Sequence, residues 1–128
     1  MILAVEDLIR AVRFYRAAFG WVQTVDGAIY AEFALPDDQR LGLYARAGFE
    51  RNVGQAPLKG RRGEITGTEF YLYVDDLAAA IARVEAAGSR ALSPRAQRAW
   101  GDEAAYFADP DGNVIVLARP NGGQSTPS

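Results

Sequence analysis

The sequence contains no cysteine and no histidine. The absence of cysteine excludes disulfides, thiolate nucleophiles, zinc–thiolate sites and iron–sulfur clusters. The absence of histidine removes the most frequent metal ligand and excludes catalysis by Ser-His-Asp or Cys-His groups. Any chemistry must therefore come from carboxylates, tyrosine, lysine, serine, threonine or backbone amides.

Long apolar runs and a strong charge of one sign are also missing. No stretch approaches the roughly 18 apolar residues that a membrane span needs. The formal net charge of −2 argues against a nucleic-acid partner, because phosphate binding usually needs a basic face. The 128 residues, 49% hydrophobic and 23% charged, match one ordinary globular domain. We therefore expect a cytoplasmic protein that binds neither nucleic acid nor a membrane.

The first 46 residues predict a strand, a helix and three further strands. Apolar residues at Leu8, Val12, Tyr15 and Phe19 are spaced by four, three and four, so they share one helical face. We expect this helix to begin after Asp7 and to end at Gly20. A strand-like run precedes it at 2–5, and turn signals separate further strands at 21–25, 28–35 and 41–45.

The same order of elements recurs in the second half. A shift of 69 residues superposes Val5-Glu6-Asp7-Leu8 on Val74-Asp75-Asp76-Leu77. The helix that opens there is followed by predicted strands at 90–92, 103–107 and 113–118, and a strand at 69–74 precedes it.

These patterns predict one α+β domain over residues 1–119, followed by a disordered tail over 120–128. Module one covers 1–46 and module two covers 68–119, and glycine-rich residues 47–67 form a connecting loop. Each helix covers one sheet face and leaves the other without a partner. We therefore expect two tandem βαβββ modules that form a curved mixed sheet around a central cleft.

Three segments carry a resemblance to a known family. Val5-Glu6-Asp7-Leu8 and Val74-Asp75-Asp76-Leu77 resemble the openings of the two halves of the vicinal oxygen chelate superfamily, which comprises glyoxalase, bleomycin-resistance and extradiol dioxygenase proteins. Asp109-Pro110-Asp111-Gly112-Asn113 resembles the turn of its closing hairpin, to which we assign a structural role. The resemblance implies a symmetric homodimer, in some members with exchanged modules.

Metal ligation is where the sequence departs from this superfamily. Its enzymes usually hold a divalent metal with His or Glu from four strands, which polarises two substrate oxygens. Carried over here, one position falls before Met1, and the others are Gly42, Glu69 and Val116. Zinc and iron sites need at least three protein ligands, and only Glu69 could ligate. We therefore expect no metal and no cofactor.

Strand alternation predicts which side chains line the cleft. Glu69 and Tyr71 share one face of their strand, and Trp100 lies on a loop at the rim. Aromatic rings in place of metal ligands suit a planar or aromatic small molecule. Glu69 is expected to orient a cationic or hydrogen-bonding group, and it is the candidate acid or base if catalysis occurs. The predicted ligand-binding residues are Tyr44, Glu69, Tyr71, Trp100, Tyr106 and Val116.

Three functions remain open from the sequence. The favoured one is a metal-independent protein of the glyoxalase/bleomycin-resistance type that binds a small organic ligand. The alternative is a metal-dependent lyase, isomerase or dioxygenase, which would need ligands at unexpected positions such as Glu32, Glu69 and Glu103. The third is a regulatory or structural interaction module, in which Tyr71 and Trp100 only pack a sheet, a loop or a dimer interface.

Overall fold

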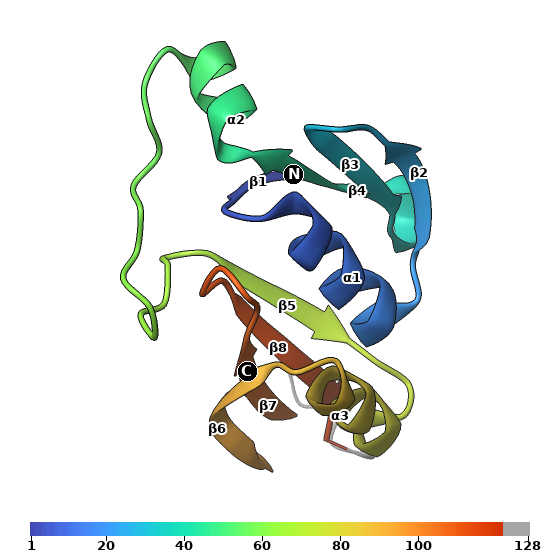
Figure 1. The fold of residues 1–128 in the computed structure, drawn as a ribbon. Coiled ribbons are helices and arrows are strands. Elements are labelled where there is room, and N and C mark those ends of the chain that lie inside the picture. Colours follow the sequence, from blue (N-terminus) through green and yellow to red (C-terminus); the bar gives the residue numbers. More distant parts are fainter. Residues whose placement is uncertain (122–128) are drawn as a thin grey trace.

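The structure is a computed structural model, and it describes residues 1–121 (Figure 1). Two four-stranded mixed sheets and their helices form an α+β fold of two modules. The elements in chain order are β1 (Ile2–Val5), α1 (Leu8–Phe19), β2 (Val22–Asp26), β3 (Tyr30–Ala34), a 3-10 turn (Pro36–Asp38), β4 (Arg40–Ala45), α2 (Arg46–Val53), β5 (Glu69–Tyr73), α3 (Leu77–Ala86), β6 (Arg90–Gln97), β7 (Asp102–Ala108) and β8 (Val114–Pro120).

The two sheets have the same topology. The strand order is β1-β4-β3-β2 in the first sheet and β5-β8-β7-β6 in the second. In each sheet the first strand of the module runs parallel to its last strand, and the other pairs are antiparallel. The prediction of two tandem βαβββ modules is therefore confirmed. Within residues 1–121 no strand of one sheet pairs with a strand of the other.

The two module helices begin in the same way. The side chain of Asp7 accepts a hydrogen bond from the Arg10 amide at 3.1 Å, and the side chain of Asp76 accepts one from the Ala79 amide at 3.0 Å. Each carboxylate thus satisfies an amide that lacks a partner within its helix. Gly20 ends α1 with a φ of 65°, a conformation that glycine adopts without steric cost. The repeat seen in the sequence therefore extends to the helix caps.

One hydrophobic core joins the helix-bearing faces of both sheets. It contains Phe14 of α1, Leu77 of α3, Leu43 of the first sheet and Ile115 of the second, all 4% exposed or less. Figure 1 shows α1 lying between the first sheet and β5. We call the opposite side of each sheet its open face, and the two open faces point away from this shared core.

A buried polar network links the modules beside the core. The Tyr15 hydroxyl of α1 donates to Oδ2 of Asp109 at 2.6 Å, and Tyr15 and Asp109 are 1% and 6% exposed. The backbone N–H of Asn113 donates to Oδ1 of Asp109 at 2.8 Å. The backbone N–H of Glu6 donates to Oδ1 of Asp111 at 2.9 Å. The turn over 109–113 therefore holds module one against module two, which agrees with its assigned structural role.

The sequence predicts a loop over the whole of 47–67, and the first part of this segment is instead helical. Its first part belongs to α2, which ends at Gly54 with a φ of 85°. A Cβ on Gly48 would lie 2.3 Å from the Tyr44 ring, so the missing side chain lets α2 approach β4 closely. The segment is polar and has no apolar stripe of its own, and tertiary contact rather than periodicity stabilises this helix.

Two further boundaries differ from the sequence expectation. β6 runs over Arg90–Gln97 rather than 90–92, and its pairing with β7 shifts register between Ala91 and Ala96. Such irregular pairing breaks the alternation from which strands are predicted. Of the predicted tail, Pro120 still belongs to β8, and residues 122–128 lie outside the described part of the chain.

No helix within residues 1–121 is long and apolar enough to cross a membrane.

Candidate functional site

The open face of the second sheet carries a row of three predicted site residues. Tyr71 of β5 and Tyr106 of β7 both pair with Val116 of the central strand β8. The three side chains belong to one cluster, separate from the main core. Trp100, on the loop between β6 and β7, joins the row because its Nε1 donates to the Tyr71 hydroxyl at 2.7 Å. The structure thus brings four of the predicted residues together.

Val116 has a different place in this row from the aromatic residues. Its side chain is 0% exposed, whereas Tyr71 and Tyr106 are half-buried and Trp100 is 43% exposed. Val116 therefore forms the floor on which the tyrosines pack, and the rings form the accessible surface.

Asp102 is a residue of this face that the sequence analysis missed. It is 7% exposed, and its Oδ2 accepts the hydroxyls of Tyr71 at 2.5 Å and of Tyr73 at 2.8 Å. Strand alternation back from Tyr106 places residue 102 on the same face, so this signal was present in the sequence. Trp100, Tyr71, Asp102 and Tyr73 form a continuous hydrogen-bonded network.

The network raises the pKa of both tyrosines further above neutral pH. Burial and the hydrogen bond to Asp102 raise the pKa of Tyr71 to about 12. The hydrogen bond to Asp102 and desolvation also raise the pKa of the more exposed Tyr73. Both hydroxyls therefore remain donors to the carboxylate, and the orientation of the rings is fixed.

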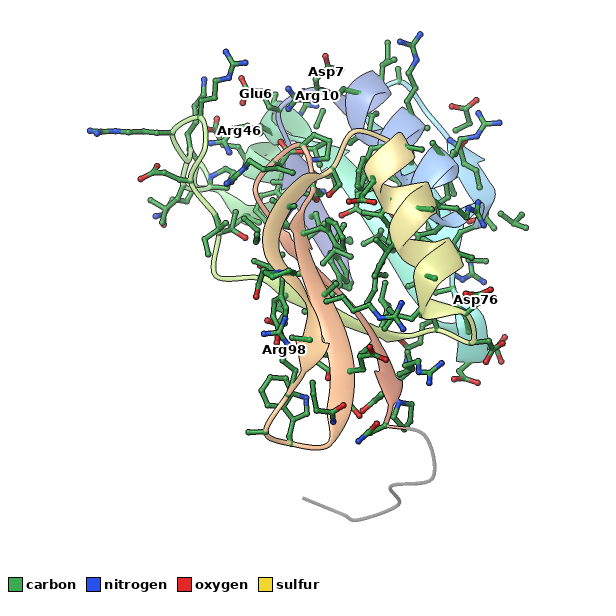
Figure 2. All side chains as sticks on the ribbon, turned by 90° about the horizontal axis from the view of Figure 1, so that it is seen from below. Glu6, Asp7, Arg10, Arg46, Asp76 and Arg98 are labelled. Carbon is green, nitrogen blue, oxygen red and sulfur yellow. The ribbon has the colours of Figure 1, made fainter. Side chains whose placement is uncertain are left out.

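Arg98 lies beside the same row. Its Nη2 donates to the carbonyl of Pro94 at 2.7 Å and to that of Ala104 at 3.0 Å. Its guanidinium carbon lies 4.9 Å from the centre of the Tyr106 ring, a cation–π distance. Figure 2 shows Arg98 on the side of β6 and β7 away from α3. A positive charge therefore adjoins the aromatic surface.

Tyr44 lies on the open face of the other sheet. Its ring centre is 5.0 Å from that of Tyr30, and its hydroxyl accepts a hydrogen bond from Nδ2 of Asn52 at 3.1 Å. Because the two open faces point away from the shared core, Tyr44 does not join Tyr71 and Tyr106 within one chain.

Glu69 is the first residue of β5 and lies opposite Val114 of β8. It is exposed and shares the face of Tyr71, as strand alternation predicts. Within residues 1–121 its carboxylate has no hydrogen-bond or ion-pair partner. It is available to a ligand at the end of the row.

The residues at the superfamily's metal positions do not fit a divalent cation. A Cβ on Gly42 would lie 2.3 Å from the Tyr30 hydroxyl, so the phenol fills the space that a ligating side chain would need. Val116 offers only aliphatic carbon, and Glu69 is the single oxygen donor of the set. Hard and borderline divalent metals need several oxygen or nitrogen ligands held together.

The unexpected ligand positions do not supply the missing donors. Glu32 accepts the Tyr30 hydroxyl at 2.8 Å and pairs with Arg40 at 2.9 Å on the first sheet. Glu103 pairs with Arg95 at 2.8 Å in the second sheet. Across residues 1–121 there is no group of three or more acidic side chains that could hold a metal ion.

Two pockets lie elsewhere on the molecule. One of about 770 Å³ opens between the modules, beneath residues 58–66 and the turn at 108–113, and Glu6, Arg10 and Arg46 lie along it (Figure 2). The other, of about 300 Å³, is bounded by α1, α3 and Trp21. Neither is lined by a predicted ligand-binding residue, so those residues form an exposed aromatic surface rather than part of either pocket.

The paired modules and their strand order define a protein of the vicinal oxygen chelate superfamily. Within it, residues 1–118 match the model of the glyoxalase-like domain, and the chain belongs to that family. The superfamily expected from the sequence is therefore confirmed.

Solved structures show the same fold at low sequence identity. A glyoxalase-related enzyme from Fulvimarina pelagi is 23% identical with a TM-score of 0.82, covering 100% of this chain and 94% of its own. A glyoxalase/bleomycin resistance protein/dioxygenase from Nocardioides is 21% identical with a TM-score of 0.81, covering 100% and 85%. A family enzyme from Burkholderia phytofirmans is 16% identical with a TM-score of 0.78, covering 94% and 95%. No curated protein matches the chain.

Proposed function

We propose that this chain is a metal-independent protein that binds an aromatic or planar organic ligand on its open sheet faces. One observation carries the proposal: the network of Trp100, Tyr71, Asp102 and Tyr73 fixes ring surfaces on the open face that also carries Glu69 and Val116, two of the positions that the resemblance to the superfamily assigns to metal ligands. Gly42 and Val116 stand at two of those positions and offer no donor atom.

The exposed rings supply the binding surface. Trp100 is 43% exposed and Tyr73 is 63% exposed, so their ring faces are available for stacking. An aromatic pair contributes about 0.5–1.5 kcal/mol beyond the area that it buries. Glu69 orients a cationic or hydrogen-bonding group of the ligand at the end of the row. The phenols of Tyr71 and Tyr73 donate to Asp102 and are not bases at neutral pH.

We propose that the protein is a homodimer. Tyr44 and the row of Tyr71 and Tyr106 lie on open faces that point away from each other, so one chain cannot place them in one cleft. A second copy whose first sheet covers the second sheet of its partner would do so. A monomer by light scattering at micromolar concentration would contradict this part of the proposal. We also propose that the protein is cytoplasmic.

Ligand binding is tested by fluorescence. The chain has two tryptophans, so Trp21→Phe leaves Trp100 as the single indole reporter. We expect a planar aromatic compound such as 2-naphthamide to quench Trp100 saturably. Tyr71→Phe, which removes the acceptor of the Trp100 N–H, is expected to weaken binding several-fold. The matched variant Tyr15→Phe removes a phenol oxygen from the core between the modules, away from both open faces, and leaves Trp100 and its partners in place.

Metal independence is tested separately. Metal analysis of the purified protein and thermal melts with Mn²⁺, Ni²⁺ and Zn²⁺ are expected to show no stoichiometric metal and no stabilisation. A cation held in the native state would raise the melting temperature by mass action. A shift of several degrees would favour the metal-dependent lyase, isomerase or dioxygenase instead.

A further inference from the structure

Arg98 lies beside the aromatic surface and has no acidic partner in the part of the chain that the structure describes. Arg98 makes no ion pair within residues 1–121, and among the arginines of this part of the chain that make none it is the one whose guanidinium lies over an aromatic ring. Its Nε is buried and has no hydrogen-bond partner among the described residues. Among the described residues, its positive charge is offset only by backbone carbonyls, the Ser93 hydroxyl and the Tyr106 ring.

The nearby carboxylate does not neutralise this charge. The Arg98 backbone N–H donates to the Asp102 carbonyl at 2.8 Å, so the two residues are adjacent. The side chain of Asp102, however, accepts the hydroxyls of Tyr71 and Tyr73 and makes no ion pair with Arg98. The hydrogen-bond network thus uses the carboxylate, and within residues 1–121 Nη1 of Arg98 is left without a partner.

Arg98 and Glu69 mark opposite margins of the tyrosine row. Glu69 lies on β5, an edge strand, and the guanidinium lies over Tyr106 of β7. Strands in a sheet are about 4.8 Å apart, and Glu69 lies two residues along β5 from Tyr71, which is in register with Tyr106. The two positions are therefore separated by roughly 12 Å or more. An anionic group is repelled at the Glu69 margin and attracted at the Arg98 margin.

We infer that Arg98 binds an anionic group, a carboxylate, carried by the planar ligand that stacks on Tyr71, Tyr106 and Trp100. This inference rests on the proposed function and narrows the ligand class to aromatic carboxylic acids. Nη2 is used by Ser93, Pro94 and Ala104 and Nε is buried, so Nη1, which has no partner within residues 1–121, is the donor for a carboxylate oxygen. The contact with Tyr106 holds the guanidinium beside the rings. The ring of the ligand and its charge are then recognised by neighbouring side chains.

The test compares two probes of nearly the same shape, 2-naphthoate and 2-naphthamide, by quenching of Trp100 in the Trp21→Phe protein. We expect naphthoate to bind at least tenfold more tightly than naphthamide at low salt, with a preference that falls as salt is added. In Arg98→Gln the preference is expected to disappear, while naphthamide binds as before. Arg98→Lys keeps the charge without the planar fork and is expected to retain part of the preference.

Arg95→Gln is the matched control. Arg95 lies on β6, just before the loop that carries Arg98, but is engaged by Glu103 at 2.8 Å, so its loss is expected to leave the preference unchanged. Equal binding of both probes to the Trp21→Phe protein would overturn the role of Arg98 and leave the proposed function intact. An equal loss of both probes in Arg98→Gln and Arg98→Lys would show a structural role and overturn the inference. Binding of neither probe would overturn the proposed function together with this inference.

Discussion

Replacing Tyr15 with phenylalanine removes one oxygen atom from the contact between the two modules. The Tyr15 hydroxyl donates to Asp109 at 2.6 Å, and both residues are almost fully buried. A hydrogen bond to a charged group contributes about 1.5–3 kcal/mol, and a buried carboxylate that loses a donor is left partly desolvated. The ring of Tyr15 stays in place, so its packing against Phe19 and Trp21 is preserved.

We expect Tyr15→Phe to lower the free energy of unfolding by about 2 kcal/mol. For a chain of this length, that corresponds to a decrease of roughly 6–10 °C in melting temperature. Urea unfolding followed by circular dichroism measures the free energy directly. Tyr30→Phe is the matched control because it removes the same atom from a less buried tyrosine within one module, and it should cost less than about 1 kcal/mol.

A double-mutant cycle assigns the effect to the pair. Asp109→Asn keeps the shape of the side chain and removes its charge. If the bond joins the modules as described, the double variant Tyr15→Phe/Asp109→Asn should be at least about 1 kcal/mol more stable than the sum of the single losses implies. Additive losses, or a loss in Tyr15→Phe no larger than in Tyr30→Phe, would refute this account of the module contact.

Three further outcomes are expected. The pKa of Tyr71 is raised to about 12 in the folded state, so the folded protein keeps this proton after the unfolded chain has lost it. The free energy of unfolding should therefore fall from about pH 10 to pH 12, and less steeply in Tyr71→Phe. Alkaline unfolding curves measure this difference. Gly42→Ala should lower the free energy of unfolding by about 1–3 kcal/mol because its Cβ would lie 2.3 Å from the Tyr30 hydroxyl. Tyr30→Ala in the same chain should remove most of this added loss. If the losses of the two single variants simply add in the double variant, the clash is contradicted. Gly112→Ala should cost roughly 1–3 kcal/mol from its φ of +86° alone, and more because the new Cβ would lie 2.4 Å from the Glu64 carbonyl oxygen; an unchanged melt would contradict this.

The shared fold does not by itself define the activity of this chain. The family model covers residues 1–118, and the cited solved structures share the fold at identities of 16–23%. The fold hosts several kinds of chemistry, and activity depends on particular side chains at the site. The chemistry of this chain therefore depends on its own side chains at the site, among them Gly42 and Val116, which offer no ligand atom at the metal positions.

The local elements and their repetition could be predicted from the order of the residues. Helix periodicity and the capping residues Asp7 and Asp76 act within a few residues, so α1 and α3 are predictable from their own segments. Strand alternation is equally local, and it placed Tyr71 and Glu69 on one face of β5. The lack of donors at Gly42 and Val116 was also evident from the sequence.

How these elements meet depends on packing between residues that are distant in the chain. Packing both helix-bearing faces into one core set Tyr44 on one side of the molecule and Tyr71 on the other, because the relative placement of two modules depends on contacts between distant residues. The burial of Asp102 and the formation of α2 against Tyr44 have the same origin. The fold also determines that Asp102 accepts the hydroxyls of Tyr71 and Tyr73 and makes no ion pair with Arg98, which the sequence alone does not predict.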